Sequence, residues 1–492
     1  MTVNLKDPAL FREQCFINGE WVAADNGDTL SVTNPTSGKV MGTVPKLGAA
    51  ETQRAIQAAY AAYPAWRAKT AQERFKILRR WFELLLENQE DLATLMTLEQ
   101  GKPIAESRGE IAYAASFIEW FAEEGKRVYG DIIPPHQSDK RIIVTKEPIG
   151  VCAAITPWNF PAAMITRKAG PALAVGCPMV VKPASATPYS ALALAELADR
   201  AGIPAGILSV VTGSSGAIGE ELTTNELVRK VTFTGSTEVG KKLIAACSGS
   251  VKKVSMELGG NAPFIVFDDA DLDAAVEGAL VSKYRNTGQT CVCTNRFLVQ
   301  DSVYSTFADK LVAAVAKMKV GNGLENDTQQ GPLIDGDAVN TVEEHIADAI
   351  NQGGQIRLGG KRHSLGGSFF EPTVITEVTP EMRLAKEETF GPVAPLFRFH
   401  TDEEAVNMAN ATEFGLASYF YTQNLARSWK ISERLEYGIV GVNTGLISTT
   451  VAPFGGVKES GLGREGSKYG VEDYLEIKYV CLGGMTPFDR PE

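Results

Sequence analysis

Two cysteines lie one residue apart in the segment Gly288–Arg296, which reads GQTCVCTNR. Glycine and polar side chains precede Cys291 and Cys293, whereas an apolar run normally hides a thiol. A cysteine nucleophile needs thiolate character and therefore donor-rich surroundings. The pair is open to four interpretations: a nucleophile with a neighbour, two metal ligands, a disulfide, or two small core residues.

The rest of the composition narrows these interpretations. The four histidines are far apart and no Cys/His zinc spacing occurs, so we expect no metal site. Seven scattered cysteines indicate a reducing compartment. No signal peptide and no apolar run of about 18 residues is recognisable, so we expect a cytoplasmic protein without a membrane partner. The net charge of −11 argues against a nucleic-acid partner.

The 492 residues predict two or three domains. Apolar strand-like runs alternate with helical patterns, which is typical of a mostly parallel, doubly wound sheet. A second alternating set follows Asp268, so two α/β domains in series are expected, with a helical region over 71–125. A hairpin pattern (127–150) and a lone strand (474–482) predict a small β-annex that completes itself against another subunit. The strand-like runs of the first set are 150–157, 178–184, 208–213, 230–235 and 262–268, and its helical patterns are 190–202 and 236–247.

Two polar residues follow strand-like runs at turns. Asn159, in TPWNFP, either caps the next helix or donates its amide to a developing oxyanion, since open α/β sheets bind ligands at the carboxyl ends of strands. Glu257, in MELGGNAP, is either a general base or a solvated turn residue.

Two further turns are suited to a nucleotide. VKPASATP brings Lys182 and Ser185 just past a strand, and FTGSTEVG places Gly235 and Ser236 before a helix, where phosphate is favoured. Neither turn carries the G-x-G-x-x-G fingerprint of dinucleotide-binding proteins.

Seven motifs together resemble the aldehyde dehydrogenase superfamily in their order. They are TPWNFP, KPAS, FTGSTEVG, MELGGNAP, GQTC, EETFGPV and PFGGVKESGLGRE. The resemblance runs from FINGEW (16–21) to the terminal strand, and FIEWFAEEGKRVYG, MITRKAGPALA and EGSKYGVEDYLEIKY are similar to the NADP-dependent succinate-semialdehyde dehydrogenases of bacterial GABA degradation. It implies an α/β fold of two doubly wound, Rossmann-like domains with a small β oligomerisation annex. The implied regions are a nucleotide-binding domain (1–126 and 148–258), a catalytic domain (259–465) and the annex (127–147 and 466–492).

The resemblance also implies roles for the reactive residues. Cys291 aligns with the nucleophile and Cys293 does not. The amide of Asn159 and the backbone N–H of Cys291 are expected to hold the oxyanion. Glu257 is expected to activate the water that hydrolyses the thioester. Two more positions match residues that relay protons in parts of the family, Glu465 and Lys168.

The cofactor contacts follow in the same way. The positions that match the family's nucleotide site are Thr156, Trp158, Lys182, Ser185, Gly213, Gly235, Ser236, Glu388 and Phe390. Ser185 stands where NAD-preferring relatives often have Glu, whose carboxylate repels a 2′-phosphate. A neutral donor removes that repulsion, so we expect NADP to be preferred, with NAD as the second cofactor.

The substrate is expected to be a small semialdehyde. Arg167, Arg285 and Ser448 match the carboxylate-binding set of succinate-semialdehyde dehydrogenases, and Arg offers bidentate geometry. The alternative for the two arginines is surface or interdomain ion pairs. Glutarate semialdehyde is one methylene longer and stays open as a substrate.

Four further points concern alternative functions, assembly and redox state. A CoA-acylating dehydrogenase is disfavoured by Glu257, and a silent binding protein would not need to keep Cys291, Glu257 and Asn159 together. We expect a homo-oligomer, either a dimer or a tetramer. A strained, readily reduced disulfide between Cys291 and Cys293 is a hypothesis that the spacing leaves open.

Overall fold

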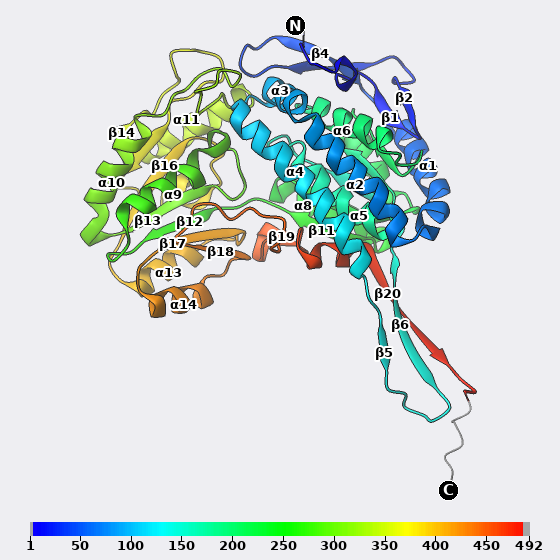
Figure 1. The fold of residues 1–492 in the computed structure, drawn as a ribbon. Coiled ribbons are helices and arrows are strands. Elements are labelled where there is room, and N and C mark those ends of the chain that lie inside the picture. Colours follow the sequence, from blue (N-terminus) through cyan, green and yellow to red (C-terminus); the bar gives the residue numbers. More distant parts are fainter. Residues whose placement is uncertain (1–2, 486–492) are drawn as a thin grey trace.

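The computed structural model describes residues 3–485, which form two sheet-centred lobes with a thin projecting arm (Figure 1). The first two residues and the last seven, which belong to the predicted nucleotide-binding domain and annex, lie outside the described residues. Two sheet-centred α/β lobes in series with a small β-annex are the arrangement that the sequence predicts (Figure 1).

The first lobe is built on an eight-stranded sheet in the order β19-β11-β10-β7-β8-β9-β1-β2. Its five central strands are parallel, and antiparallel strands lie at both edges. The strand order reverses between β7 and β10, which is where doubly wound sheets bind ligands. The strands are β1 (Cys15–Ile17), β2 (Glu20–Val22), β7 (Val151–Ile155), β8 (Met179–Lys182), β9 (Leu208–Val210), β10 (Val228–Thr234), β11 (Lys253–Glu257) and β19 (Gly461–Leu462).

Helices cover both faces of this sheet because successive strand residues point to opposite sides. Cys152 and Ala154 face one core, and Val151 and Ala153 face the other. The first layer contains α2 (Ala71–Glu87), α3 (Gln89–Gln100), α4 (Ile104–Glu124), α5 (Ala163–Val175) and α6 (Pro188–Arg200), and the second contains α1 (Ala49–Ala68), α7 (Ser215–Thr224) and α8 (Thr237–Cys247).

The second lobe repeats this arrangement around a seven-stranded sheet in the order β14-β15-β16-β13-β12-β17-β18, parallel except for β14. The strands are β12 (Ala262–Val266), β13 (Thr294–Gln300), β14 (Gln355–Leu358), β15 (Thr373–Thr376), β16 (Val393–Phe399), β17 (Ala417–Tyr421) and β18 (Ile439–Val442). One face carries α9 (Leu272–Tyr284) and α10 (Asp301–Val315); the other carries α11 (Gly336–Asn351), α12 (Arg383–Lys386), α13 (Asp402–Asn410) and α14 (Leu425–Arg434).

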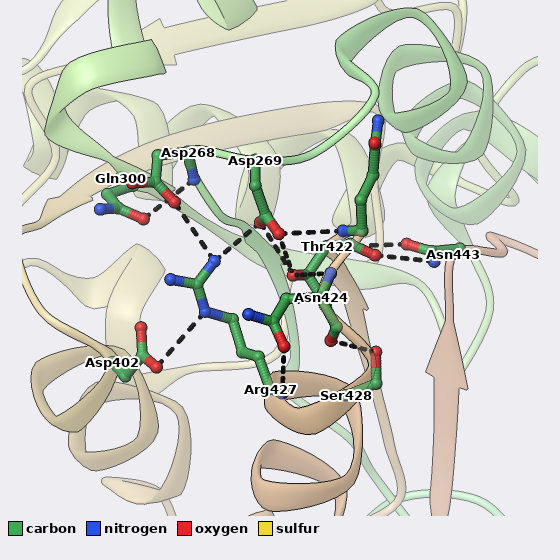
Figure 2. A network of polar contacts seen from close by, with 10 residues as sticks. Asp268, Asp269, Gln300, Asp402, Thr422, Asn424, Arg427, Ser428 and Asn443 are labelled. Carbon is green, nitrogen blue, oxygen red and sulfur yellow. Dashed lines mark hydrogen bonds and ion pairs between the residues drawn. The ribbon is translucent and has the colours of Figure 1, made fainter.

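A polar network ties the edge of this second sheet to its helices (Figure 2). The guanidinium of Arg427, on α14, lies 2.7 Å from Asp269 and 3.3 Å from Asp402, and it covers the ring of Phe267. Thr422 donates to Asp269 at 2.8 Å. Burial acts to raise the pKa of Asp269, but the Thr422 hydrogen bond and the Arg427 charge outweigh it and lower that pKa.

The projecting arm is a three-stranded antiparallel sheet of β5 (Asp131–Ile133), β6 (Arg141–Pro148) and β20 (Leu475–Leu482). β20 pairs with β6 over its whole length. The hairpin and the terminal strand therefore complete each other within one chain, which corrects the expectation of strands without a local sheet. Apolar side chains remain exposed on the arm, namely Tyr129, Ile132, Ile477 and Tyr479.

The domain boundaries remain a prediction. The short strand β19 lies in the segment predicted to be catalytic, yet it pairs with β11 at the edge of the first sheet. A separate two-stranded ribbon joins β3 (Thr29–Thr33) to β4 (Val40–Pro45).

Candidate active site

The two sheets meet end to end. The turns after β7 and β10 carry Asn159 and Gly235, and β11 ends at Glu257, all at the carboxyl edge of the first sheet. Cys291 lies just before β13, at the amino edge of the second sheet. A Cβ atom on Gly260, which links β11 to β12, would collide with the carbonyl oxygen of Cys291. Glycine at 260 therefore allows the nucleophile candidate to approach the first sheet.

A cavity of about 300 Å³ opens at this junction. It brings together seven of the predicted residues from four separate stretches of sequence. They are Trp158, Asn159, Gly235, Ser236, Cys291, Glu388 and Phe390, and the ring of Phe390 meets that of Trp158 edge to face at 6.1 Å.

Four predicted cofactor residues do not line this cavity. The backbone of Thr156 pairs with that of Lys182, whose ammonium is buried and lies 3.3 Å from the carbonyl oxygen of Pro183. Ser185 is exposed. Gly213 forms a backbone bridge with Leu47, and a Cβ atom there would strike the Leu47 backbone, which explains the glycine. Their cofactor roles remain predictions.

The carboxylate of Glu388 packs against two glycines. Its Oε1 accepts the Gly260 N–H at 2.8 Å, and its other oxygen lies 2.9 Å from the position that a Cβ atom on Gly259 would take. Burial raises the pKa of Glu388 to about 8, although the Gly260 hydrogen bond and the charge of Lys283 oppose the shift.

A second, smaller cavity of about 30 Å³ lies on the other side of Cys291. The three predicted substrate residues all line it, so the structure brings Arg167, Arg285 and Ser448 together with Cys291. Only Arg167 forms an ion pair, with Glu465, and it is 2% exposed. Arg285 lies 5.4 Å from the centre of the Phe160 ring. The surface form of the ion-pair alternative is therefore wrong for Arg167. Its buried pair joins residues from the predicted nucleotide-binding and catalytic regions, as the interdomain form of that alternative expected.

The two cysteines differ in their surroundings. Cys291 is half-buried and borders both cavities, whereas Cys293 is buried and its thiol donates to the carbonyl oxygen of Lys283. Burial raises the pKa of Cys291 to about 12; the charge of Arg167 opposes this shift, and Glu388 and Glu257 add to it. All seven cysteines, which lie within the described residues, are free thiols.

Glu257 belongs to a buried cluster of charges. It ends β11, is 3% exposed and has no hydrogen-bond partner on either carboxylate oxygen within the described chain. The interpretation as a solvated turn residue is therefore wrong. Burial and the neighbouring Glu465 raise its pKa, against the charges of Arg167 and Lys168. Glu465 also pairs with Lys168, whose ammonium contacts the Thr234 hydroxyl at 2.7 Å.

Asn159 does not cap the helix that follows it. Its amide donates to the carbonyl oxygen of Gln289 at 3.1 Å, two residues before Cys291. Glu110, on α4, accepts the free N–H groups of Ala162 and Ala163 at the start of α5 instead. The side chain of Asn159 is therefore directed at the segment that carries the nucleophile candidate.

A set of buried side chains holds that segment. Asn286 donates from Nδ2 to the carbonyl oxygens of Asn159 at 2.9 Å and of Gln289 at 3.2 Å. Gln100, at the end of α3, donates to Asn286 at 2.9 Å, and Lys102 donates to the Asn159 carbonyl oxygen at 2.6 Å and to Glu110 at 2.5 Å. The backbone of Asn286 is left-handed (φ 52°), so these contacts stabilise a strained turn.

Comparisons with known proteins agree with this geometry. The sequence profile of the aldehyde dehydrogenase family matches residues 21–480. The chain belongs to the aldehyde dehydrogenase family. It is 68% identical to a glutarate-semialdehyde dehydrogenase of Pseudomonas aeruginosa, covering 98% of this chain and all of that one. It is 66% identical to the NADP-dependent succinate-semialdehyde dehydrogenase of Escherichia coli, with the same coverage. A solved E. coli NADP-dependent enzyme superposes with a TM-score of 0.97 at 66% identity, over 98% of this chain and all of that one.

The larger cavity of this aldehyde dehydrogenase fits a dinucleotide. It lies at the reversal of strand order, and Ser236 caps the amino end of α8, where phosphate is favoured. The Glu388 carboxylate offers acceptors for ribose hydroxyls. Residues 3–485 contain no group of three or more His, Cys, Asp or Glu side chains arranged for a metal, and none of their helices is long and apolar enough to span a membrane.

Sequence reasoning missed several residues of this aldehyde dehydrogenase site. Tyr113 and Thr290 line the smaller cavity, and Gln100, Lys102 and Asn286 hold Asn159. The only sequence signal was the polar flank of Cys291, which includes Asn286 and Thr290. Tyr113, Gln100 and Lys102 lie in helical or loop patterns from which their contacts with distant residues cannot be predicted.

Replacing Asn286 by Gly tests the support of Asn159. Glycine keeps the left-handed turn but removes both hydrogen bonds, so the Asn159 amide and the Cys291 backbone lose their fixed spacing. We expect kcat to fall roughly 10- to 100-fold, since misplacement by about 1 Å is that costly. The KM for the nucleotide should stay within about twofold, because Asn286 itself does not line the larger cavity.

Thr287→Gly is the matched control. Thr287 is also left-handed, but its hydroxyl donates to Gly331 at 3.1 Å instead of to Asn159 or Gln289. Steady-state kinetics should show a smaller loss of kcat for Thr287→Gly than for Asn286→Gly. Equal losses in kcat for the two variants would contradict the positioning role of Asn286.

The raised pKa of Cys291 predicts the pH dependence of its alkylation. Only the thiolate reacts, so inactivation by iodoacetamide without nucleotide should accelerate about tenfold per pH unit from pH 7 to 9. A cysteine of ordinary pKa, about 8.5, would level off near pH 9. The rate of activity loss at each pH measures the rate of alkylation. Peptide mass spectrometry confirms labelling at Cys291, and Cys291→Ser is the control that cannot be labelled at this position. A plateau below pH 9 would contradict the prediction.

Proposed function

We propose that this aldehyde dehydrogenase oxidises succinate semialdehyde to succinate with reduction of NADP. The observation that carries the proposal is that Cys291 borders two cavities, one suited to a dinucleotide and one lined by Arg167 and Arg285. An aldehyde held with its carbonyl group at the thiol places a distal carboxylate among the arginines. Arg–carboxylate pairs supply geometric selectivity as well as charge.

In the proposed mechanism Glu257 takes the proton of the Cys291 thiol and passes it to solvent, and the thiolate then attacks the aldehyde carbon to form a thiohemiacetal. The Asn159 amide and the Cys291 N–H donate to the oxyanion. NADP, when bound along Trp158, Ser236 and Glu388, supplies the hydride acceptor that the oxidation requires. Glu257 then takes a proton from the water that hydrolyses the thioester on Cys291, which releases the acid. Its lack of hydrogen-bond partners leaves both oxygens able to hold that water.

Glutarate semialdehyde is the second candidate substrate. The relatives named for it, from two Pseudomonas species, are 68% and 69% identical to this chain. The small volume beside Cys291, about 30 Å³, favours the shorter acid. One methylene is worth about 1–3 kcal/mol, so activity with both is expected, with succinate semialdehyde ahead.

Three further properties belong to the proposal. Free thiols at all seven cysteines support a cytoplasmic location. The exposed apolar residues of the arm support a dimer or tetramer in which the arms are covered. Ser185 supports a preference for NADP over NAD, because it introduces no carboxylate to repel a 2′-phosphate.

An aldehyde panel tests the substrate. We expect kcat/KM to fall in the order succinate semialdehyde, glutarate semialdehyde, then butanal, which has four carbons but no carboxylate. The gap between the acid aldehyde and butanal should be at least about 100-fold, as expected when buried donors lose their partner. Cys291→Ala should abolish turnover of all three. Equal kcat/KM for butanal and succinate semialdehyde would refute an acid-aldehyde function.

Exchange of one side chain tests the cofactor preference. Wild-type enzyme should have the higher kcat/KM with NADP, and Ser185→Glu should reverse the ratio in favour of NAD, because a carboxylate repels the 2′-phosphate. Ser185→Ala is the control for loss of the hydroxyl alone. A wild-type preference for NAD would overturn the assignment.

A further inference from the structure

The smaller cavity contains a side chain whose hydroxyl the proposed mechanism leaves unexplained. Tyr113 extends from α4 into the wall that also contains Arg167, Arg285, Ser448 and Cys291. Its hydroxyl oxygen is buried and has no hydrogen-bond partner in the described chain. Buried polar atoms are almost always paired, and leaving one unpaired costs about 1–3 kcal/mol.

Packing explains the ring of Tyr113 but not its hydroxyl. The ring meets that of Phe117 edge to face, with centroids 4.8 Å apart. Phenylalanine would make the same contact and would leave no polar atom without a partner. A buried tyrosine normally directs its hydroxyl at a partner, so this hydroxyl is available to a ligand of the cavity.

Two other residues that line the smaller cavity also have buried polar atoms without a hydrogen-bond partner. The Nη2 atom of Arg167 and the hydroxyl of Thr290 are also buried without a hydrogen-bond partner. All three groups can donate, and no described residue lining the cavity carries a carboxylate. A pocket whose unpaired atoms are donors is complementary to an acceptor-rich group.

The charge of Arg167 is already shared. Glu465 pairs with it, so the guanidinium cannot give its full charge to a ligand. A neutral donor beside it adds a hydrogen bond without adding a buried charge that would need its own counter-ion. Burial raises the pKa of Tyr113, against the charges of Arg167 and Arg285, so the phenol keeps its proton at neutral pH.

We propose that Tyr113 is a specificity-determining residue that donates its hydroxyl hydrogen to the distal carboxylate of the aldehyde, alongside Arg167 and Arg285. The inference rests on the proposed acid-aldehyde function and deepens it. It assigns to α4 a role in distinguishing aldehydes that end in a carboxylate from aldehydes that end in a methyl group.

Tyr113→Phe tests the inference because it removes only the hydroxyl. We expect KM for succinate semialdehyde to rise roughly 10- to 100-fold, the range for a hydrogen bond to a charged group. kcat should change less than KM, and kcat/KM for butanal should stay unchanged or increase. Tyr60→Phe, in which an exposed tyrosine of α1 is changed, is the matched control.

A binding measurement without turnover supplies the second readout. Succinate should bind the wild-type enzyme, and its Kd by calorimetry should rise by a factor similar to that in KM for Tyr113→Phe. The thermal midpoint of the variant should be no lower than that of the wild type, because the variant loses an unpaired buried hydroxyl, and its NADP affinity should match. Both results exclude a folding defect as the cause.

The outcomes separate this inference from the proposed function. If wild type prefers succinate semialdehyde to butanal and Tyr113→Phe keeps that preference undiminished, the role of Tyr113 is wrong and the function stands. If wild type shows no such preference, the function itself is wrong. Equal losses for the acid and the neutral aldehyde would assign Tyr113 to packing and would also overturn the inference.

Discussion

The carbonyl oxygen of Asn159 accepts hydrogen bonds from two buried side chains, and the rest of the site depends on that junction. Lys102 approaches it from the helical layer of the first lobe, and Asn286 approaches it from the second lobe. A buried ammonium is costly unless it is paired, and Glu110 provides that pair at 2.5 Å. Because Glu110 also accepts the free N–H groups that begin α5, one carboxylate fixes Lys102, Asn159 and the helix that carries Arg167.

The same burial also determines the protonation states of Cys291 and Glu257. Cys291 and Glu257 are both weak acids in a poorly solvated centre, and the pKa of each is raised. The nearby carboxylates of Glu388 and Glu257 make the thiolate less favourable. Of the main influences on the pKa of Cys291, only the charge of Arg167 favours the thiolate. The resting state therefore keeps the thiol protonated. Formation of the thiolate therefore costs free energy, and that cost must be offset by a later step. Stabilisation of the oxyanion by hydrogen-bond donors can offset it.

Local sequence patterns predicted much of the fold. The runs at 150–157, 230–235 and 262–268 became β7, β10 and β12, and the turn residues after them lie at the predicted carboxyl edge. Long-range partners were not predictable in this way. The capping alternative for Asn159 was wrong because Glu110, about fifty residues earlier, occupies the cap. β6 and β20 pair although more than 300 residues separate them, which no periodicity within either strand reveals.

The same limit applies inside the site. Tyr113 lies in an ordinary helical pattern, and its importance appears only when Arg167, Arg285 and Ser448 surround it from three other segments. Gly213 has a structural explanation of its own, because its closeness to Leu47 requires glycine without any ligand, and its cofactor role stays a prediction. Residue type reveals the chemistry available to a chain, but the neighbours of a residue decide whether that chemistry is used, and those neighbours are set by topology.

The separation of the two cavities has a consequence for substrate range. Among the described residues that line the two cavities, only Cys291 borders both. Changes at the other residues of the smaller cavity therefore do not alter the lining of the larger one. Relatives that share about two-thirds of this sequence are named for substrates that differ by one methylene. Discrimination of that size, about 1–3 kcal/mol, needs only small changes in packing. Under the proposed function, changes at apolar residues of the smaller cavity such as Met164 and Phe454 would alter the preferred substrate length without any change in the chemistry at the thiol.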